Sequence, residues 1–289
     1  MFYRLSLFDS QQESVVGLLN QHFSQLQLSH LQHQSKGEKD APVYEWSWQG
    51  DESIEPLSEA LTNLRDTRGI DFVLQTSALP LKGIKLAVFD MDSTLIQAEV
   101  MDELAYAFGI GDKVAHITAE AMAGRLDFEQ SFRKRLALLE GFETLQLANI
   151  RQQIKLMPGA QKLMQGLQQK GIHCAILSGG FSYFADDLAN KLGMQEAHSN
   201  ALEELDGKLT GKANGVLVDA ARKVELLEQI SNRLGVELSQ CLAVGDGAND
   251  LPMLNKAGLG VAFHGKPLVR ARAPHQMNKG GLDQLLHII

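Results

Sequence analysis

Residues 84–94 read IKLAVFDMDST, a short apolar run that ends in Asp90 and Asp92. Three later apolar runs have similar length, namely HCAILS (173–178), CLAVG (241–245) and LGVAF (259–263). Helix-forming stretches separate these runs, and buried parallel strands have this composition, so we predict a doubly wound α/β sheet. Ligands bind such sheets just beyond the carboxyl ends of the strands. Asp90 and Asp92 are therefore expected to lie at a functional site.

Two insertions interrupt this α/β pattern. The segment between the first two apolar runs is much longer than a crossover helix needs, and we expect residues 99–157 to form an inserted helical cap. Within it, Asp127 followed by Gln130 has the spacing of a capping box and predicts the start of a helix. A smaller insertion, residues 200–218, is expected to be a β-hairpin that turns at residues 206–207.

Residues 1–79 form a separate unit, ahead of the α/β unit at residues 80–289. Its predicted order is strand, helix, strand, strand, helix, strand, which is typical of a small ferredoxin-like α+β domain. Tyr44, Trp46 and Trp48 alternate with polar residues, as in a strand with one buried face. We place the strands at 2–8, 26–31, 44–48 and 70–75, the helices at 11–23 and 54–64, a polar loop at 33–40 and a linker at 77–80.

The composition bounds the class of protein. The chain has 289 residues, 44% of them hydrophobic and 21% charged, which is normal for a globular protein. Its net charge of −8 would repel nucleic acid and anionic lipid, so neither is an expected partner. No apolar run is long enough to span a membrane, and the first residues lack the features of a secretory signal. Cys174 and Cys241 lie within apolar runs, so we expect buried, reduced thiols and a cytoplasmic location.

A second acidic motif, GDGAND at residues 245–250, follows the third apolar run. It adds Asp246 and Asp250 at the edge of the sheet that already carries the first acidic pair. Clustered carboxylates repel one another unless a cation lies between them, and Mg²⁺ is a hard divalent ion that prefers oxygen ligands. Simpler interpretations stay open at each place: a polar turn after the first strand, and a glycine-rich turn that caps a helix. A calcium loop of the EF-hand type is excluded, because it needs Asp or Asn where Thr94 stands and Gly where Leu95 stands.

Two more features are suited to binding a phosphate group. Ser178, Gly179 and Gly180 follow the second apolar run at the start of a helix, where backbone N–H groups cradle anions. Lys223 lies in the first turn of a helix that begins near Asp219. A cation there opposes the helix dipole, so Lys223 is a candidate for neutralising a phosphoryl oxygen. An ordinary helix start and a solvated lysine are the simpler interpretations, but the whole set supplies what in-line phosphoryl transfer requires.

Four stretches of the chain resemble the haloacid dehalogenase superfamily and, within it, the phosphoserine phosphatases. They are DMDSTLIQAEVMDELA (90–105), ITAEAMAGRLDFEQSFRKRLALLEG (117–141), LSGGFSYFADDL (177–188) and AVGDGANDLPML (243–254). The resemblance covers residues 83–289. It implies Mg²⁺-dependent hydrolysis of O-phospho-L-serine, the last step of serine biosynthesis, through an aspartyl-phosphate intermediate. Asp90 would be the nucleophile, and Asp92 would protonate the departing serine oxygen and then activate water.

The resemblance also implies the rest of the site. The implied metal ligands are Asp90, the main-chain carbonyl of Asp92, and Asp246, with Asp250 in the outer shell. The residues implied in holding the phosphoryl group are Ser178, Gly179, Lys223 and Asn249, and those implied in lining the closed pocket are Met122, Phe128 and Phe181. Glu99 would meet the substrate ammonium and Arg135 its carboxylate, a pairing that suits a planar guanidinium.

Two other functions stay open beside phosphoserine hydrolysis. One is a phosphotransferase that moves the phosphate to another hydroxyl, such as that of homoserine. The other is an amino-acid-sensing regulator with a vestigial phosphatase domain, which would be expected to lack the nucleophile or a metal ligand; neither is missing here. The N-terminal unit resembles an ACT-like regulatory domain in its order of elements. Binding an amino acid, forming a homodimer, and packing against the catalytic domain are its three candidate roles.

Overall fold

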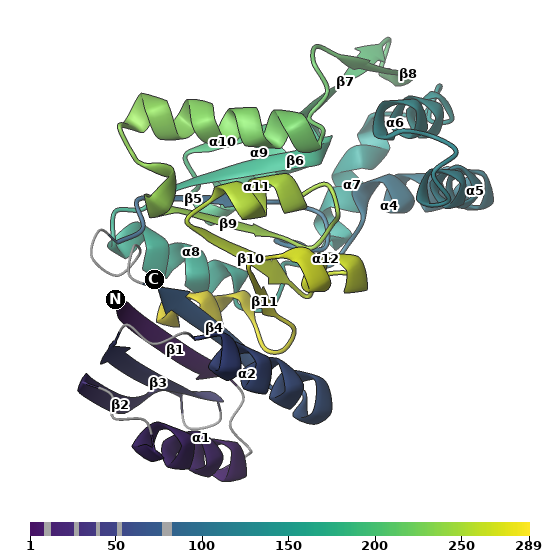
Figure 1. Cartoon of the computed structure of the whole chain (residues 1–289). Helices are drawn as coiled ribbons and strands as arrows, with labels where there is room; N and C mark the ends of the chain where they lie inside the picture. The colour runs from purple at the N-terminus through teal and green to yellow at the C-terminus, as the bar shows by residue number, and fades with distance from the viewer. Residues whose placement is uncertain (9–12, 26–28, 39–40, 51–53, 77–82) are drawn as a thin grey trace.

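The apolar run that precedes Asp90 forms β5 (Leu86–Phe89), the central strand of the larger domain. The computed structural model describes residues 1–8, 13–25, 29–38, 41–50, 54–76 and 83–289. In these residues the sheet around β5 has seven strands in the order β11-β10-β9-β5-β6-β7-β8 (Figure 1). Neighbouring strands are parallel except for β7 and β8, so the predicted doubly wound sheet is confirmed. The strands are β6 (His173–Phe181), β7 (Glu196–Leu205), β8 (Lys208–Asn214), β9 (Cys241–Gly245), β10 (Leu259–Phe263) and β11 (His275–Met277).

Side chains of the buried strands alternate between the two faces of this sheet. Ala87 and Phe89 belong to the apolar core on one face, and Leu86 and Val88 belong to the core on the other. The first face is covered by α8 (Ala160–Gln169) and α9 (Ser182–Leu192), and the second by α10 (Ala220–Leu234), α11 (Leu251–Lys256) and α12 (Pro267–Arg272). Because helices cover both faces, a ligand reaches the sheet only at the ends of its strands.

The insertion between β5 and β6 is a helical cap, as predicted. Its helices are α4 (Val100–Ala107), α5 (Gly111–Met122), α6 (Phe128–Ala137) and α7 (Leu145–Gln153). The predicted capping box begins α6, since Asp127 accepts the Gln130 N–H at 2.7 Å and Gln130 accepts the Asp127 N–H at 3.3 Å. Ile96 and Leu156 form a β-bridge, so the two chain segments that join the cap to the sheet run side by side.

Strands β7 and β8 form the predicted hairpin. Asp206 and Gly207 make its turn with φ values of 51° and 75°, as a two-residue turn between twisted strands requires. The hairpin is hydrogen-bonded to the cap: Gly141 N–H donates to the Leu209 carbonyl at 2.8 Å, and Thr144 N–H donates to the Gly207 carbonyl at 2.9 Å. The two insertions are therefore fastened to each other as well as to the sheet.

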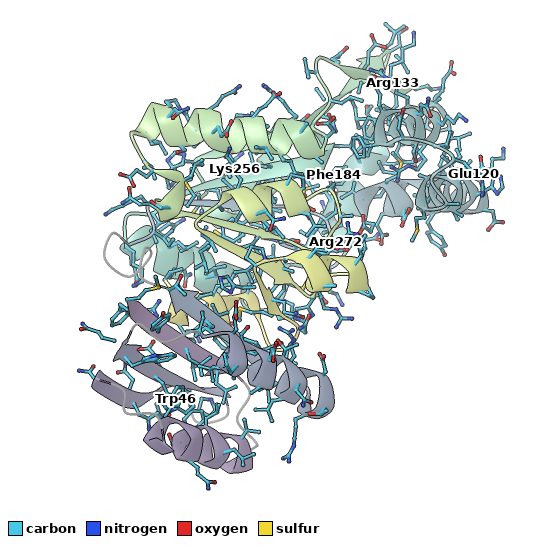
Figure 2. The ribbon with its side chains drawn as sticks, viewed as in Figure 1. Trp46, Glu120, Arg133, Phe184, Lys256 and Arg272 are labelled. Atoms are coloured by element: carbon cyan, nitrogen blue, oxygen red, sulfur yellow. The ribbon has the colours of Figure 1, made fainter. Side chains whose placement is uncertain are left out.

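The N-terminal domain has a second sheet, with four antiparallel strands among its described residues in the order β2-β3-β1-β4. This order and the two helices on one face confirm the predicted ferredoxin-like arrangement. Trp46 is buried beside α1 (Figure 2), and its indole N–H donates to Asn20 Oδ1 at 2.9 Å. The elements are β1 (Phe2–Phe8), α1 (Glu13–Gln25), β2 (Ser29–Glu38), β3 (Ala41–Gln49), α2 (Glu55–Arg68) and β4 (Asp71–Thr76).

Three details differ from the sequence predictions. The polar loop predicted at 33–40 is wrong over 33–38, because β2 continues to Glu38 and pairs with β3, and residues 39–40 lie outside the described residues. Residues 32–35 are exposed on an edge strand, where backbone pairing needs no apolar alternation. The first half of β7, which pairs in parallel with β6, and the three-residue β11 were not predicted. Residues 26–28 and the predicted linker at 77–80 lie outside the described residues.

The second face of the N-terminal sheet packs on the larger domain. Phe8 and Val73 belong to the same apolar core as Leu285 near the C-terminus. The Arg4 guanidinium donates to the Ile288 carbonyl at 2.8 Å, which adds a polar contact across the same boundary. The two domains thus share one core as well as a covalent connection.

Both cysteines are free and buried, as predicted. Burial raises the pKa of Cys174 to about 12 and the pKa of Cys241 to about 11, so both thiols stay protonated and unreactive near neutral pH. Across the described ranges, none of the helices combines the length and the apolar character that crossing a bilayer would demand.

Candidate active site

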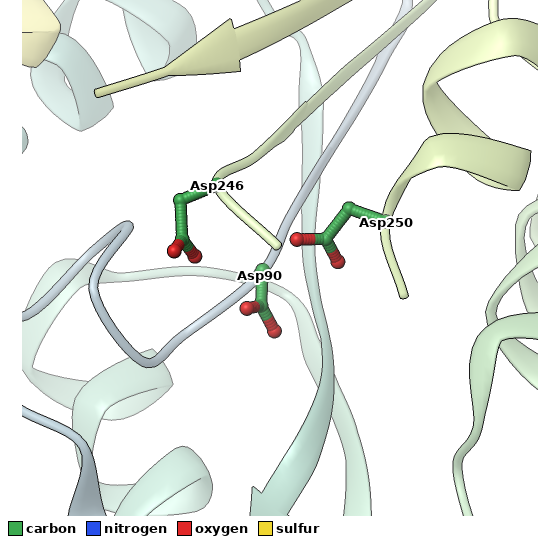
Figure 3. A group of neighbouring side chains, drawn as sticks. All are labelled: Asp90, Asp246 and Asp250. Atoms are coloured by element: carbon green, nitrogen blue, oxygen red, sulfur yellow. The ribbon is translucent and has the colours of Figure 1, made fainter. Parts of the chain in front are cut away.

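Three aspartates meet at the carboxyl edge of the central strands (Figure 3). Asp90 directly follows β5, Asp246 directly follows β9, and Asp250 immediately precedes α11. Their carboxylate oxygens lie within 4.8 Å of one another, and all three residues are buried. The Asp90 N–H donates to the Val244 carbonyl at 2.9 Å, so the pairing of β5 with β9 continues to the site. The predicted convergence of these acids is therefore observed.

Lys223 is the buried cation of this cluster. Its Nζ atom lies 2.7 Å from Asp90 Oδ1 and 2.6 Å from Asp250 Oδ1, and the side chain has no exposed surface. Burial alone would lower the pKa of Lys223, but the neighbouring Asp250 and Asp90 carboxylates outweigh it and raise the pKa. Asp219 accepts the Arg222 N–H at 2.7 Å and begins α10, which carries Lys223 into the site as predicted.

Asp250 already uses both of its carboxylate oxygens. Oδ1 contacts Lys223, and Oδ2 accepts the Gly247 N–H at 2.9 Å. A Cβ atom on Gly245 would lie 2.4 Å from the Asp250 carboxyl carbon, so this acid packs directly on the turn that carries Asp246. Asp250 is thereby placed to support the loop and Lys223 rather than to offer a free oxygen.

Asp90 and Asp246 are acids in an unfavourable place for negative charge. Burial and then the charge of Asp250 raise the pKa of Asp90 well above its ordinary value, although Lys223 opposes the shift. Burial raises the pKa of Asp246 to about 6, with Lys266 acting in the opposite direction. A divalent cation between them would remove this penalty, and a buried group of oxygen ligands is the chemistry that Mg²⁺ selects. The residues present therefore fit a magnesium site.

Asp92 has a separate environment from the three clustered acids. Burial raises the pKa of Asp92 to about 7, although the Val100 N–H donates to its Oδ1 atom at 2.9 Å and favours the charged form. A Cβ atom on Gly180 would lie 2.6 Å from Asp92 Oδ2, so the end of β6 approaches the segment after β5 closely at this point. A carboxyl group with a pKa near neutrality can both donate and accept a proton.

The carboxyl end of β6 presents a hydroxyl and backbone groups beside Asp92. Ser178 is fully buried, and its Oγ atom accepts the Gly180 N–H at 2.9 Å. Asn200 fixes this segment: its amide donates to the Gly179 carbonyl at 2.8 Å, and its Oδ1 atom accepts the Val218 N–H at 2.9 Å. Asn200 was not predictable from the sequence, because its contacts form only when β7 lies beside β6.

The predicted pocket residues lie in different surroundings. Phe128 on α6 reaches residues 178–180 at the end of β6, the predicted phosphate loop. A Cβ atom on Gly179 would lie 3.4 Å from the Phe128 ring. Phe181 is buried, and its ring centroid lies 5.9 Å from that of Phe132. Met122 is 84% exposed at the end of α5, so it lies on the surface in this structure. Asn249 is partly buried beside Gly247, whose Cβ position would lie 2.3 Å from Asn249 Oδ1.

The two predicted recognition groups lie on the cap and at its base. Glu99 directly precedes α4, is 46% exposed, and accepts the Ser93 hydroxyl at 2.9 Å. Arg135 is partly buried in the last turn of α6. Burial lowers the pKa of Arg135, while Asp102 and Glu99 act to raise it, so these acids lie within electrostatic range of the guanidinium. The structure therefore brings an acid and a guanidinium within electrostatic range of each other where the cap meets its base.

Lys266 is a site residue that the sequence interpretation missed. Its Nζ atom lies 3.5 Å from Asp246 Oδ2 and 3.6 Å from Glu99 Oε1, and its N–H donates to the Asp246 carbonyl at 3.0 Å. Thr94 was likewise missed as a partner, although its hydroxyl donates to Asp246 Oδ1 at 3.4 Å. The signal for Lys266 was its position just past β10, at the same edge of the sheet as the acids.

Comparisons with known proteins agree with this geometry. The family model of the haloacid dehalogenase-like hydrolases matches residues 84–258. A phosphoserine phosphatase of Streptomyces coelicolor is 44% identical over 235 residues, which are 81% of this chain and 57% of that protein. The chain thus spans little more than half of that curated relative.

Two solved structures extend the comparison. The HAD family hydrolase t0658 of Salmonella enterica serovar Typhi is 30% identical, with a TM-score of 0.89 over 99% of this chain and 98% of that one. A phosphoserine phosphatase solved as a phospho-aspartyl intermediate analogue is 40% identical, with a TM-score of 0.67 over 72% of this chain and 100% of that one. The first solved structure matches the N-terminal domain as well as the larger domain. The second solved structure is a shorter chain, and all of it matches part of this one.

Proposed function

Because the chain belongs to the haloacid dehalogenase-like hydrolase family, we propose that it hydrolyses O-phospho-L-serine to L-serine and phosphate with the help of Mg²⁺. The observation that carries this proposal is the buried contact of Lys223 with both Asp90 and Asp250, within reach of Asp246. Two phosphoserine phosphatases are similar to this chain, and this similarity supports the choice of substrate.

In the first step Asp90 attacks phosphorus. A bond forms between its carboxylate oxygen and phosphorus, and the bond from phosphorus to the serine oxygen breaks. Asp92 gives its proton to that oxygen, and a pKa of about 7 leaves part of this carboxyl group protonated at neutral pH. Ser178, the Gly179 N–H and Lys223 hold the phosphoryl oxygens, with Asn249 beside them.

In the second step water releases the phosphate. The Asp92 carboxylate takes a proton from water, the water oxygen bonds to phosphorus, and the Asp90–phosphorus bond breaks. Asp90, Asp246 and the main-chain carbonyl of Asp92 would hold Mg²⁺, which would supply positive charge for the phosphoryl oxygens. Asp250 supports the site from the outer shell, in keeping with its two occupied oxygens.

The cap and its base recognise the serine part of the substrate. Arg135 pairs with the substrate carboxylate and Glu99 with its ammonium group. Phe128, which touches the phosphate loop from α6, and Phe181 cover the bound substrate, and Met122 joins them when the cap closes. Closure would then couple the identity of the substrate to the exclusion of water.

A phosphate-release panel tests this proposal. Phosphoserine, phosphothreonine, phosphotyrosine and several sugar phosphates are each incubated with the protein and Mg²⁺, and then again after chelation. Phosphoserine should be turned over at least about tenfold more efficiently than the others, and chelation should abolish release. A sugar phosphate as the preferred substrate, or full activity after thorough chelation, would contradict the proposal.

The two alternatives are separated in the same assay. Homoserine added with phosphoserine would yield phosphohomoserine at the expense of free phosphate if the protein were a phosphotransferase. A vestigial regulator would release no phosphate from any substrate. We favour hydrolysis because the nucleophile, the buried lysine and the acidic cluster are all in place. The reduced, buried cysteines fit the cytoplasm as the compartment, and a homodimer formed by the N-terminal domain is the assembly that we would test first.

A further inference from the structure

A cavity of about 920 Å³ lies between the two domains, away from the acidic cluster. One wall comes from α2 and β4 of the N-terminal domain, and the other from α12, β11 and the residues that follow β11 (Figure 1). This volume falls in the range of small-molecule sites, which occur preferentially at domain boundaries. The polar and charged residues that line it include Arg65, Asp66, Asp71, Arg270, His275, Asn278 and Lys279.

The acids of this cavity are already engaged. Asp71 is 1% exposed and accepts the backbone N–H groups of Asn278 at 2.5 Å and Lys279 at 2.7 Å, so it closes the loop after β11. Asp66 is 3.8 Å from the Arg65 Nε atom and is 71% exposed. Arg65 in turn stacks on the Phe72 ring at 5.1 Å. The Asp71 carboxylate also lies within electrostatic range of Lys279, whose charge acts to lower the pKa of Asp71, so it offsets part of the positive charge of that lysine.

The opposite wall is positively charged. No carboxylate in the described part of the chain forms an ion pair with the Arg270 guanidinium, and Lys279 adds a second cation beside the cavity. The Lys279 Nζ atom approaches Gly69 of the N-terminal domain, where a Cβ atom would lie 3.5 Å away. On a chain with a net charge of −8, a concave region with an arginine that no described carboxylate neutralises attracts small anions.

Helix α12 connects this cavity to the active site. Pro267, Arg270 and Ala271 line the cavity, while Val269 of the same helix is fully buried in the domain core. Lys266 immediately precedes α12 and contacts both Asp246 and Glu99. A displacement of this six-residue helix therefore moves a side chain that lies on the metal-binding acid.

We propose that the cavity between α2, β4, α12 and β11 binds a small anion, a carboxylate or a phosphate, through Arg270 and Lys279, and that α12 transmits its occupancy to Asp246 and Glu99. A guanidinium without a carboxylate partner is suited to either anion by bidentate hydrogen bonds. The N-terminal domain would thus take part in ligand binding together with the catalytic domain, across their shared boundary.

Calorimetric titration of the full chain tests the binding site without reference to the proposed phosphatase activity. Malonate and inorganic phosphate are titrated separately into the unmodified chain, Arg270→Gln and the matched control Arg272→Gln. Arg272 lies on the same helix (Figure 2) and does not line the cavity. Phosphate that binds at the active site contributes equally to all three proteins, so only the difference between them counts.

At least one anion should bind the unmodified chain and Arg272→Gln with affinities within about twofold, and bind Arg270→Gln at least about tenfold more weakly. Malonate alone would identify a carboxylate site, and phosphate alone a phosphate site. The absence of any Arg270-dependent binding at millimolar concentration, or equal losses in both variants, would overturn the site. Thermal melts of both variants confirm that they are folded.

The kinetic measurement rests on the proposed phosphatase activity. The anion that binds through Arg270 should change KM for phosphoserine at least about twofold more in the unmodified chain and in Arg272→Gln than in Arg270→Gln, where only competition at the active site remains. An anion that binds through Arg270 but changes KM and kcat equally in all three proteins would overturn the transmission through α12.

Discussion

The ε-ammonium group of Lys223 lies 2.7 Å from the Oδ1 atom of Asp90, in a place where the lysine has no contact with solvent. The two residues are 133 positions apart in the chain, and the contact joins α10 to the end of β5. A lysine in this position holds one oxygen of the proposed nucleophile and also contacts Asp250. The contact therefore serves both the fold and the chemistry of the site.

Lys223→Met should abolish phosphate release and destabilise the chain by about 3–5 kcal/mol, because removing one partner leaves buried carboxylates unpaired. Urea unfolding and phosphate release measure the two effects. Lys256→Met is the matched control: Lys256 is half exposed (Figure 2), and its contact with Glu228 at 2.7 Å is worth little at the surface. Equal losses of stability in both variants would show that the buried contact contributes no more to stability than the surface contact does.

Asp90→Asn should leave the fold intact and lower turnover by at least about a thousandfold, because the amide cannot form the phospho-enzyme. Burial raises the pKa of Asp90, so a neutral isostere should unfold at the same or a higher temperature in the absence of metal. Asp187→Asn, at a surface contact with Arg151, is the control for the same chemical change. Near-normal turnover in Asp90→Asn would rule out the aspartyl-phosphate route.

Mg²⁺ should raise the melting temperature of the chain, by a free energy that reaches about 2.7 kcal/mol at a hundred times the dissociation constant. Asp246→Asn should lose most of this stabilisation, since it removes an acid of the cluster. Asp102→Asn on α4 should keep it, because Asp102 lies outside the three-acid group. Scanning calorimetry with and without a chelator gives the comparison, and an equal response in both variants would place the metal elsewhere.

Arg135→Ala should raise KM for phosphoserine by about 10- to 100-fold and change hydrolysis of an aryl phosphate by less than about threefold, because only phosphoserine carries the carboxylate that Arg135 would bind. Arg133→Ala on the same helix (Figure 2) is the control, since Arg133 is exposed and pairs with Glu129 at 2.7 Å. Comparable losses of activity on phosphoserine and on the aryl phosphate would show that Arg135 does not recognise the substrate carboxylate.

His275 should make the folded chain sensitive to acid. Burial lowers the pKa of His275 from 6.5 to about 4, so between these values the unfolded chain binds a proton that the folded chain does not. Stability from this group is therefore complete above pH 6.5 and is lost as the pH falls toward 4, by up to about 3 kcal/mol. His275→Gln should flatten the fall between pH 7 and pH 4.5 in urea unfolding. The exposed His116→Gln is the control, and identical pH profiles for the two variants would refute this assignment.

Strong local signals made much of the fold predictable. The apolar runs of β5, β6, β9 and β10 needed no tertiary information, because strands covered on both faces are continuously apolar. Asp127 and the turn at 206–207 were predictable for a similar reason, since capping boxes and two-residue turns depend on neighbouring residues. The polar half of β2 and the short β11 were not predictable, because both pair at sheet edges, where backbone pairing needs no long apolar run or alternation.

The same distinction between local signals and tertiary contacts applies to the residues of the site. Asp90 and Asp246 were predictable because each follows an apolar strand directly, and the rules of parallel sheets then bring them to one edge. Lys266 and Asn200 owe their roles to segments that meet only in the folded chain. Met122, in contrast, was assigned by resemblance to a closed pocket, and in this structure its side chain lies on the surface.

The hydrogen bonds between the hairpin and the cap couple the two insertions mechanically. Gly141 and Thr144 of the cap hold the hairpin tip, while Asn200 at the hairpin base holds Gly179 at the end of β6. A rotation of the cap about the bridge of Ile96 with Leu156 would therefore carry the hairpin with it. In the proposed mechanism, opening of the cap would then disturb the residues that hold the phosphoryl group.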